Sequence, residues 1–148
     1  MSESMWVRSH VRQLLQEHWD VCRVKTDGDG DHPFRQGTAM GWVSVLPTSP
    51  PMVRVWAHAA LQVRPTAKLF RWLNQAQRSA LSARAEVDGD LVVVSQTICA
   101  EGLTLPVLAQ AISAVGGMAD EIGPVIAALF DGVTPFPARL ADVDEEAS

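Results

Sequence analysis

Three closely spaced carboxylates offer the plainest opportunity for chemistry in this sequence. They lie in the segment Asp27-Gly28-Asp29-Gly30-Asp31, and clustered carboxylate oxygens are the ligands that calcium prefers. A calcium loop of the EF-hand type needs glycine at its sixth position and glutamate at its twelfth. Counted from Asp27, those positions hold His32 and Thr38. The pattern therefore favours a solvated turn between strands, with weak calcium binding as the alternative.

The histidines and serines do not form a recognisable metal or catalytic motif. His10 and His18 are about two helical turns apart, too far for one small metal ion without other ligands. Ser79 and Ser82 fall in a predicted helix without the glycine-flanked turn of a nucleophilic serine. We therefore predict no catalytic residues, no metal ligands and no cofactor, and a protein that is not an enzyme. The four histidines, which show no HxxxH or HxH spacing, are His10, His18, His32 and His58.

Both cysteines fall in predicted strands. A reduced, buried thiol is the ordinary state of such a residue, and a cytoplasmic setting disfavours a disulfide between Cys22 and Cys99. Structural zinc needs four ligands, so two distant cysteines do not indicate a zinc site. The sequence assigns neither residue a redox role.

Two tryptophans are better candidates for partner binding. Trp56 alternates with Val53 and Val55 along a predicted strand, so it points to the opposite face of the sheet. Trp72 lies about 110° from the centre of its helix's apolar stripe. A large aromatic side chain outside the core often marks a binding or dimer surface. Neighbouring elements could equally bury both faces.

A row of cations accompanies Trp72 on the same predicted helix. Lys68, Arg71 and Arg78 recur at helical spacing, opposite the stripe that contains Leu69 and Leu73. Such a row is typical of a solvated face. In the sharper interpretation, it receives an acidic segment of a partner or of a second subunit.

These residues must be positioned by eight elements in the order α-β-β-β-α-β-β-α. The order predicts an α+β fold in which the helices pack largely on one face of an antiparallel sheet. It also predicts one domain over residues 1–134 and a flexible acidic tail over 135–148. A two-residue turn at Asp88-Gly89 marks the last hairpin, and Gly132 is expected at the C′ position of the last helix. Apolar periodicity places helices at about 5–19, 66–81 and 105–130, and strands at 21–25, 38–46, 52–60 and on both sides of the Asp88-Gly89 turn.

The composition is that of one soluble globular domain. A chain of 148 residues, 47% hydrophobic and 20% charged, can bury a substantial core. We see no apolar run near the roughly 20 residues of a membrane span and no signal-peptide pattern, so we expect a cytoplasmic protein without a membrane partner. A pI near 5.2 disfavours nucleic acid as a partner.

Charge is divided unevenly along the chain. Residues 1–84 carry 11 lysines and arginines against 6 acidic residues, whereas residues 85–148 carry 1 against 11. Opposite halves of this kind can attract each other within one chain, pair two chains or bind a charged partner.

The order of elements, together with several short motifs, resembles the YbjN domain family, which shares its fold with type III secretion chaperones of the CesT type. The resemblance covers about residues 5–132, although Gln75 and Gln77 stand where a second asparagine often follows in the family. The matching motifs are the Asp27–Asp31 loop, Leu69-Phe70-x-x-Leu73-Asn74, the hairpin at Asp88-Gly89, Gly102-Leu103-Thr104, Ala119-Asp120 and Phe130-x-Gly132.

The resemblance implies a domain without catalytic activity that is often dimeric and holds an extended protein segment. We therefore expect a homodimeric chaperone, adaptor or regulator that binds a protein or peptide client, with Trp56, Trp72, Lys68, Arg71 and Arg78 as the residues expected to contact partners. A small-molecule-sensing regulatory domain is the alternative. An unrecognised hydrolase would require a nucleophile and base in contact.

Overall fold

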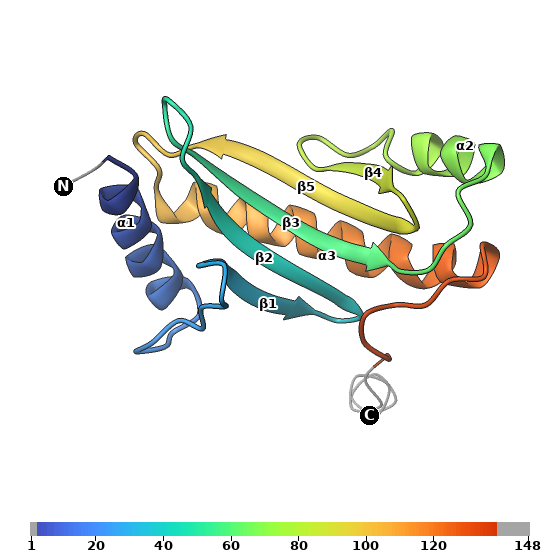
Figure 1. The fold of residues 1–148 in the computed structure, drawn as a ribbon, viewed down its shortest axis with the longest axis horizontal. Coiled ribbons are helices and arrows are strands. Elements are labelled where there is room, and N and C mark those ends of the chain that lie inside the picture. The colour runs from blue at the N-terminus through green and yellow to red at the C-terminus, as the bar shows by residue number, and fades with distance from the viewer. Residues whose placement is uncertain (1–2, 139–148) are drawn as a thin grey trace.

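The computed structural model describes residues 3–138 and shows three helices around one five-stranded sheet (Figure 1). Its element order is the one that the sequence predicts, and the fold is α+β. The elements are α1 (Glu3–His18), β1 (His32–Gln36), β2 (Ala39–Leu46), β3 (Met52–Ala60), α2 (Ala67–Ala76), β4 (Arg84–Asp88), β5 (Leu91–Cys99) and α3 (Leu105–Leu129).

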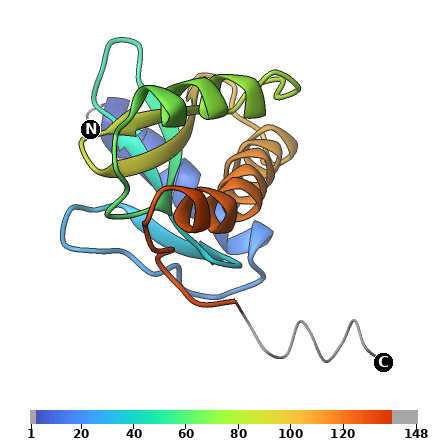
Figure 2. The same ribbon diagram turned by 90° about the vertical axis from the view of Figure 1, so that its right-hand side faces the viewer.

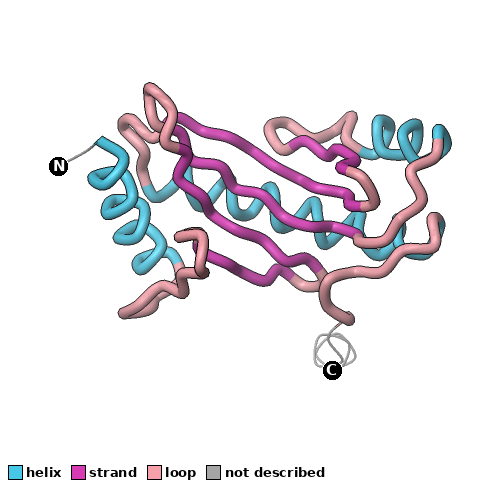
Figure 3. Tube along the Cα trace, in the orientation of Figure 1, coloured by secondary structure: helices cyan, strands magenta, loops and turns pink. Residues whose placement is uncertain are grey.

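The strands lie in the order β1-β2-β3-β5-β4, and every neighbouring pair is antiparallel (Figure 3). The first three strands form a meander. The chain then passes through α2 and returns as the β4–β5 hairpin, whose second strand pairs with β3. In this register Trp42 stands opposite Trp56 on the neighbouring strand.

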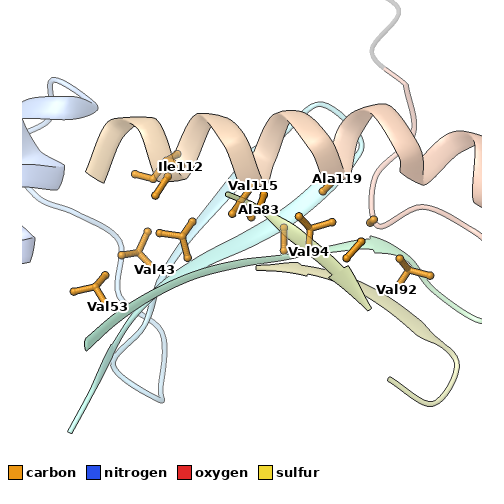
Figure 4. Packing of buried hydrophobic residues seen from close by; sticks show 14 of the residues in the cluster. Val43, Val53, Ala83, Val92, Val94, Ile112, Val115 and Ala119 are labelled. Atoms are coloured by element: carbon orange, nitrogen blue, oxygen red, sulfur yellow. The ribbon is translucent and has the colours of Figure 1, made fainter. Parts of the chain in front are cut away.

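The core is the layer between α3 and one face of the sheet. Alternate residues of β2, β3 and β5 point toward the helix, including the fully buried Val43, Val53 and Val94. Figure 4 shows them on the side of the sheet below α3, where Ile112, Val115 and Ala119 point toward the strands. Burying a valine-sized side chain stabilises the fold by about 1.5–3 kcal/mol, so this layer is the main source of stability. Val7, Val11 and Leu15 of α1 and Leu69 and Leu73 of α2 extend the same core.

The helix α3 is the one described helix that is long and apolar enough, by length and composition, to cross a membrane. This corrects the expectation that no apolar segment approaches that length. In the structure its apolar stripe is buried against the sheet, which is how a core helix behaves. It continues through Pro124 as a single helix.

Two close approaches fix α3 over the sheet. Gly123 lies so near the carbonyl oxygen of Ala59 that a side chain there would overlap it. One turn earlier in the helix, the carboxylate of Asp120 accepts hydrogen bonds from the backbone N–H of Thr38 (2.8 Å) and from its hydroxyl (3.0 Å). The helix therefore holds the β1–β2 turn directly, and Gly37 leaves room for the carboxylate.

The first strand is not where the sequence predicts it. Residues 21–25 are irregular, with only Val24 buried, and the strand β1 instead occupies part of the predicted acidic loop. Residues 21–25 alternate as a strand would, but no strand of the sheet pairs with them. Pro33 is tolerated in β1 because an edge strand does not need every backbone N–H.

Three boundaries also differ from the prediction. The helix α2 ends at Ala76, because the side chain of Gln77 bonds both the N–H and the carbonyl of Ala85 (3.0 and 3.1 Å) and redirects the chain toward β4. The hairpin turn consists of Gly89 and Asp90, since Asp88 still pairs with Leu91. At the end of α3, Asp131 takes the left-handed conformation (φ 57°) that was expected of Gly132.

Neither cysteine is buried. Cys22 lies in the irregular segment after α1, and Cys99 ends β5, where its side chain is exposed. Both are free thiols, so the prediction of buried thiols was wrong for both.

Part of the predicted tail contacts the domain. The N–H of Phe136 donates to the carbonyl of Thr38 (3.0 Å), and Arg35 stacks on the Phe136 ring. Just before the tail, Val133 pairs with Leu61. The remaining tail residues, 139–148, lie outside the described residues, so their predicted flexibility stays a prediction.

Replacing Asp120 tests the contact between α3 and the β1–β2 turn. We expect Asp120→Ala to lower the free energy of unfolding by about 1–3 kcal/mol, because it leaves the Thr38 donors without their charged acceptor. Urea unfolding measures the change, and Glu101→Ala, at an exposed carboxylate in the loop before α3, is the control. Equal stability of the two variants would contradict this role of Asp120.

Candidate protein-binding surfaces

The face of the sheet opposite α3 carries no helix (Figures 1 and 2). Strand alternation and register place one set of side chains of β2 and β3 on this face. We call it the open face and define it by Met40, Trp42, Ser44, Arg54, Trp56 and His58. All of these except the buried Ser44 are partly exposed.

An ordered aromatic cluster occupies the middle of the open face. The rings of Trp42 and Trp56 stack with centroids 4.4 Å apart and planes 24° from parallel. The His58 ring meets both edge-on, at 4.8 and 5.7 Å. The indole N–H of Trp56 donates to the hydroxyl of Ser44 (2.9 Å), and the Arg54 guanidinium lies 5.4 Å from the Trp56 ring centroid. These contacts fix the rings in place before any partner arrives, which lowers the entropy lost on binding.

His58 is electrostatically perturbed by this position. Partial burial among the aromatic rings lowers its pKa from the usual 6.5, while the negative charge of Asp88 acts in the opposite direction. Burial has the larger effect, so the imidazole is neutral at pH 7 and the centre of the open face carries no charge from it.

A second surface lies between α2 and α3. It is a groove of about 640 Å³ whose apolar lining includes Trp72, Leu81, Met118 and Val125, with Gln110 and Glu121 among its polar lining residues. We call it the α2–α3 groove.

The loop that follows α2 borders this groove. There Leu81 is fully exposed, with a relative accessibility of 101%. Its neighbour Ser82 is held in a ring of three hydrogen bonds of 3.0–3.2 Å with Gln96 of β5 and Gln110 of α3. The exposed leucine therefore projects from an anchored loop.

The structure places the predicted partner-binding residues on separate surfaces. Trp56 lies on the open face, as the strand alternation predicts. Trp72 is only partly exposed and lines the α2–α3 groove. Lys68, Arg71 and Arg78 are exposed but do not line that groove. Arg78 and both serines at 79 and 82 follow the end of α2 and are not helical.

Sequence reasoning did not single out Trp42, His58 or Leu81 as site residues. Trp42 becomes prominent only through the register that sets it beside Trp56. The short connection between residues 46 and 52 was the signal that could have identified this pair. Leu81 falls inside the helix predicted at about 66–81, and its exposure follows from the early end of α2.

The acidic loop is organised as a turn. One carboxylate oxygen of Asp27 accepts from the backbone N–H groups of Asp29 (2.9 Å) and Asp31 (3.0 Å). The three carboxylates come within 4.8 Å of one another, as exposed acidic groups often do without a metal ion. His32 is buried nearby, and its ring bonds Lys25 and Thr26 rather than the carboxylates.

Comparison with solved structures shows the same fold in secretion chaperone complexes. A chain of the ExsC–ExsE complex matches with a TM-score of 0.62 at 15% identity, over 80% of this chain and 95% of that one. A chain of the HopA1–SchA chaperone–effector complex matches with 0.63 at 13% identity, over 82% and 96%. YbjN from E. coli matches with 0.54 at 17% identity, over 79% and 91%. No curated protein has a significantly matching sequence.

One protein family matches nearly the whole described chain. It is described as T3SS (YopN, CesT) and YbjN peptide-binding chaperone 1, and the match covers residues 5–138. The motifs that carried the resemblance to YbjN and CesT-type chaperones lie inside this match. The chain therefore belongs to the family of type III secretion and YbjN peptide-binding chaperones.

Proposed function

We propose that this protein is a cytoplasmic, non-enzymatic chaperone or adaptor that binds an extended segment of a client protein on its open face. The observation that carries the proposal is the ordered Trp42–Trp56 pair on a sheet face that no described helix covers. Large, rigid aromatic side chains of this kind dominate binding energy at protein interfaces.

The chemistry of the open face indicates what the client segment contains. Stacked indoles and a neutral imidazole favour apolar or aromatic side chains. Arg54, whose guanidinium lies near the Trp56 ring, adds a positive charge beside them. An apolar segment with an acidic residue next to it would match both features.

We further propose that two copies associate through the α2–α3 groove. A fully exposed leucine on an anchored loop beside an apolar groove is costly in a monomer, because both surfaces remain in contact with water. Insertion of Leu81 from each copy into the partner's groove, against Trp72, would bury both and would be self-complementary, as a two-fold interface requires. Lys68, Arg71 and Arg78 would then be available on the rim for acidic residues of a partner.

The alternative is a small-molecule-sensing domain, and the α2–α3 groove is the observation that favours it. Its volume of about 640 Å³ falls in the range of ligand pockets. A metabolite that binds there would raise the melting temperature, whereas the groove's occupation by a second copy would prevent this.

Replacing Trp56 tests client binding. Phage that display random 15-residue peptides provide the probe, and peptides selected on the wild-type protein are titrated against variants. We expect Trp56→Ala to weaken binding about 30-fold, the effect of losing roughly 2 kcal/mol at a hot spot. Trp6→Ala removes an exposed tryptophan (57%) outside both surfaces and should leave the affinity unchanged. Equal loss in both variants, or loss in neither, would refute binding at the open face.

Replacing Leu81 tests the dimer. We expect the wild-type protein to elute as a dimer at micromolar concentration in size-exclusion chromatography with light scattering. Leu81→Asp should yield a folded monomer, because a carboxylate cannot be desolvated in an apolar groove without a large cost. The control is Val107→Asp, at an exposed position of α3 (46%) that does not line the groove. A wild-type monomer would overturn the proposed assembly.

The lowered pKa of His58 predicts a pH effect on stability. When the pH falls below 6.5, the imidazole gains a proton in the unfolded chain before it does so in the fold. The unfolded state then binds more protons, so the free energy of unfolding decreases. We measure the free energy of unfolding with urea at pH 7.5 and at pH 5.5. We expect it to decrease more in the wild type than in His58→Gln. Parallel pH profiles would show that His58 does not contribute.

A further inference from the structure

We infer that the acidic C-terminal segment, residues 139–148, binds within its own chain to a basic groove between the end of α1 and the edge strand β1. This contact would use neither the open face nor the α2–α3 groove. It follows from the geometry of the groove, its uncompensated charge and the place where the described chain ends.

The basic groove consists of two adjacent cavities that share the residues Arg23, Val24 and Lys25. The first, of about 570 Å³, is also lined by Arg12, Gln16, Cys22 and Thr26. The second, of about 310 Å³, lies against β1 and is also lined by Trp19, Val21, Pro33, Phe34 and Arg35. A polar, basic site therefore adjoins an aromatic one, in which the Trp19 and Phe34 ring centroids are 6.1 Å apart.

The positive charge of this groove is uncompensated in the described chain. Arg12, Arg23, Lys25 and Arg35 line it, and no acidic residue does. The ion pair found among residues 3–138 joins Arg64 and Asp131 elsewhere. Glu17, Asp20 and Asp27 belong to the same segments but do not line either cavity. A concave site with four cations and no carboxylate attracts an anionic segment.

The described part of the chain ends next to one end of the groove, and an anionic segment follows it. Arg35 donates to the carbonyl of Pro137 (3.1 Å), and its guanidinium lies 4.3 Å from the centroid of the Phe136 ring. Residue 138 is thus placed beside the cavity that Arg35 lines. The next ten residues contain Asp142, Asp144, Glu145 and Glu146, with Leu140 before them, Val143 between the first two, and Arg139 as the one cation.

The length of the segment is sufficient. Ten extended residues reach about 33 Å, whereas the five residues of β1 span about 17 Å. The segment can therefore extend along β1 past Phe34 toward Trp19, and its last acidic residues can reach Arg23 and Lys25. This contact would also use part of the uneven charge along the sequence, because an acidic end of the chain would meet a basic groove formed by its first half.

Cys22 provides a natural reporter, because it is an exposed thiol in the lining of the groove, while the exposed Cys99 lies at the far end of β5. The experiment measures the rates at which uncharged N-ethylmaleimide modifies each cysteine, by peptide mass spectrometry. The proteins compared are the full chain, a chain that ends at residue 138, and a full chain with Asp142→Asn, Asp144→Asn, Glu145→Gln and Glu146→Gln. We expect Cys22 to react roughly fivefold faster in the last two proteins than in the full chain, because several weak exposed ion pairs together hold the segment over the groove. Cys99 should react at the same rate in all three proteins.

Two further measurements make the test specific. Raising the salt concentration to about 1 M, where charges are screened within roughly 3 Å, should accelerate Cys22 in the full chain and not in the shortened one. A synthetic peptide of residues 138–148 should restore protection to the shortened chain, and its neutralised counterpart should not. Equal Cys22 rates in all three proteins would overturn the inference, as would parallel acceleration of Cys99. Protection of Cys22 that grows with protein concentration would also overturn it, because the contact would then join two chains.

Discussion

The structure depends on the burial of one side of α3 against one side of the sheet. A 25-residue helix offers a single apolar stripe, and the sheet has two faces, so only one face can be covered in this way. The other face remains in contact with solvent, so its side chains must tolerate hydration. Here that face carries two stacked tryptophans, a histidine and an arginine rather than a uniformly polar surface. The packing that stabilises the domain therefore also produces the surface on which we place its function.

The two proposed binding surfaces can be occupied at the same time. The α2–α3 groove is built from helices, and the open face belongs to the opposite side of the sheet. A dimer formed through the groove would leave both open faces available, so association and client binding need not compete. Each dimer could then hold two segments of a client, and a second segment binds more readily once the first is attached.

The sequence predicted best those elements whose own residues determine them. The strict alternation of β3 predicted its bounds, 52–60, as the structure has them, and the long apolar stripe predicted α3. The strand β1 could not be found in this way, because its short sequence, His-Pro-Phe-Arg-Gln, has little strand character and is fixed by pairing with β2 and by the bond from Thr38 to Asp120. Residues 21–25 have better alternation but lack a partner strand.

The candidate site was predictable to a similar extent. The orientation of Trp56 follows from local alternation, whereas its stacking on Trp42 requires the register between two strands. The exposure of Leu81 depends on where α2 ends, and that end is set by a bond between Gln77 and Ala85. Residues that act through such distant contacts cannot be identified from periodicity alone, although the family resemblance correctly indicated the kind of protein.

The segment that follows α3 connects the end of β3 to the β1–β2 turn. Its backbone pairs at Val133 with Leu61, just after β3, through bonds of 2.7 and 2.9 Å, and then bonds Thr38 in the β1–β2 turn. A pulling force applied at the C-terminal side would act on these backbone hydrogen bonds before it reached the core. A tag or fusion partner attached there would consequently transmit force first to this hydrogen-bonded segment. The sheet and α3 would be protected from that force.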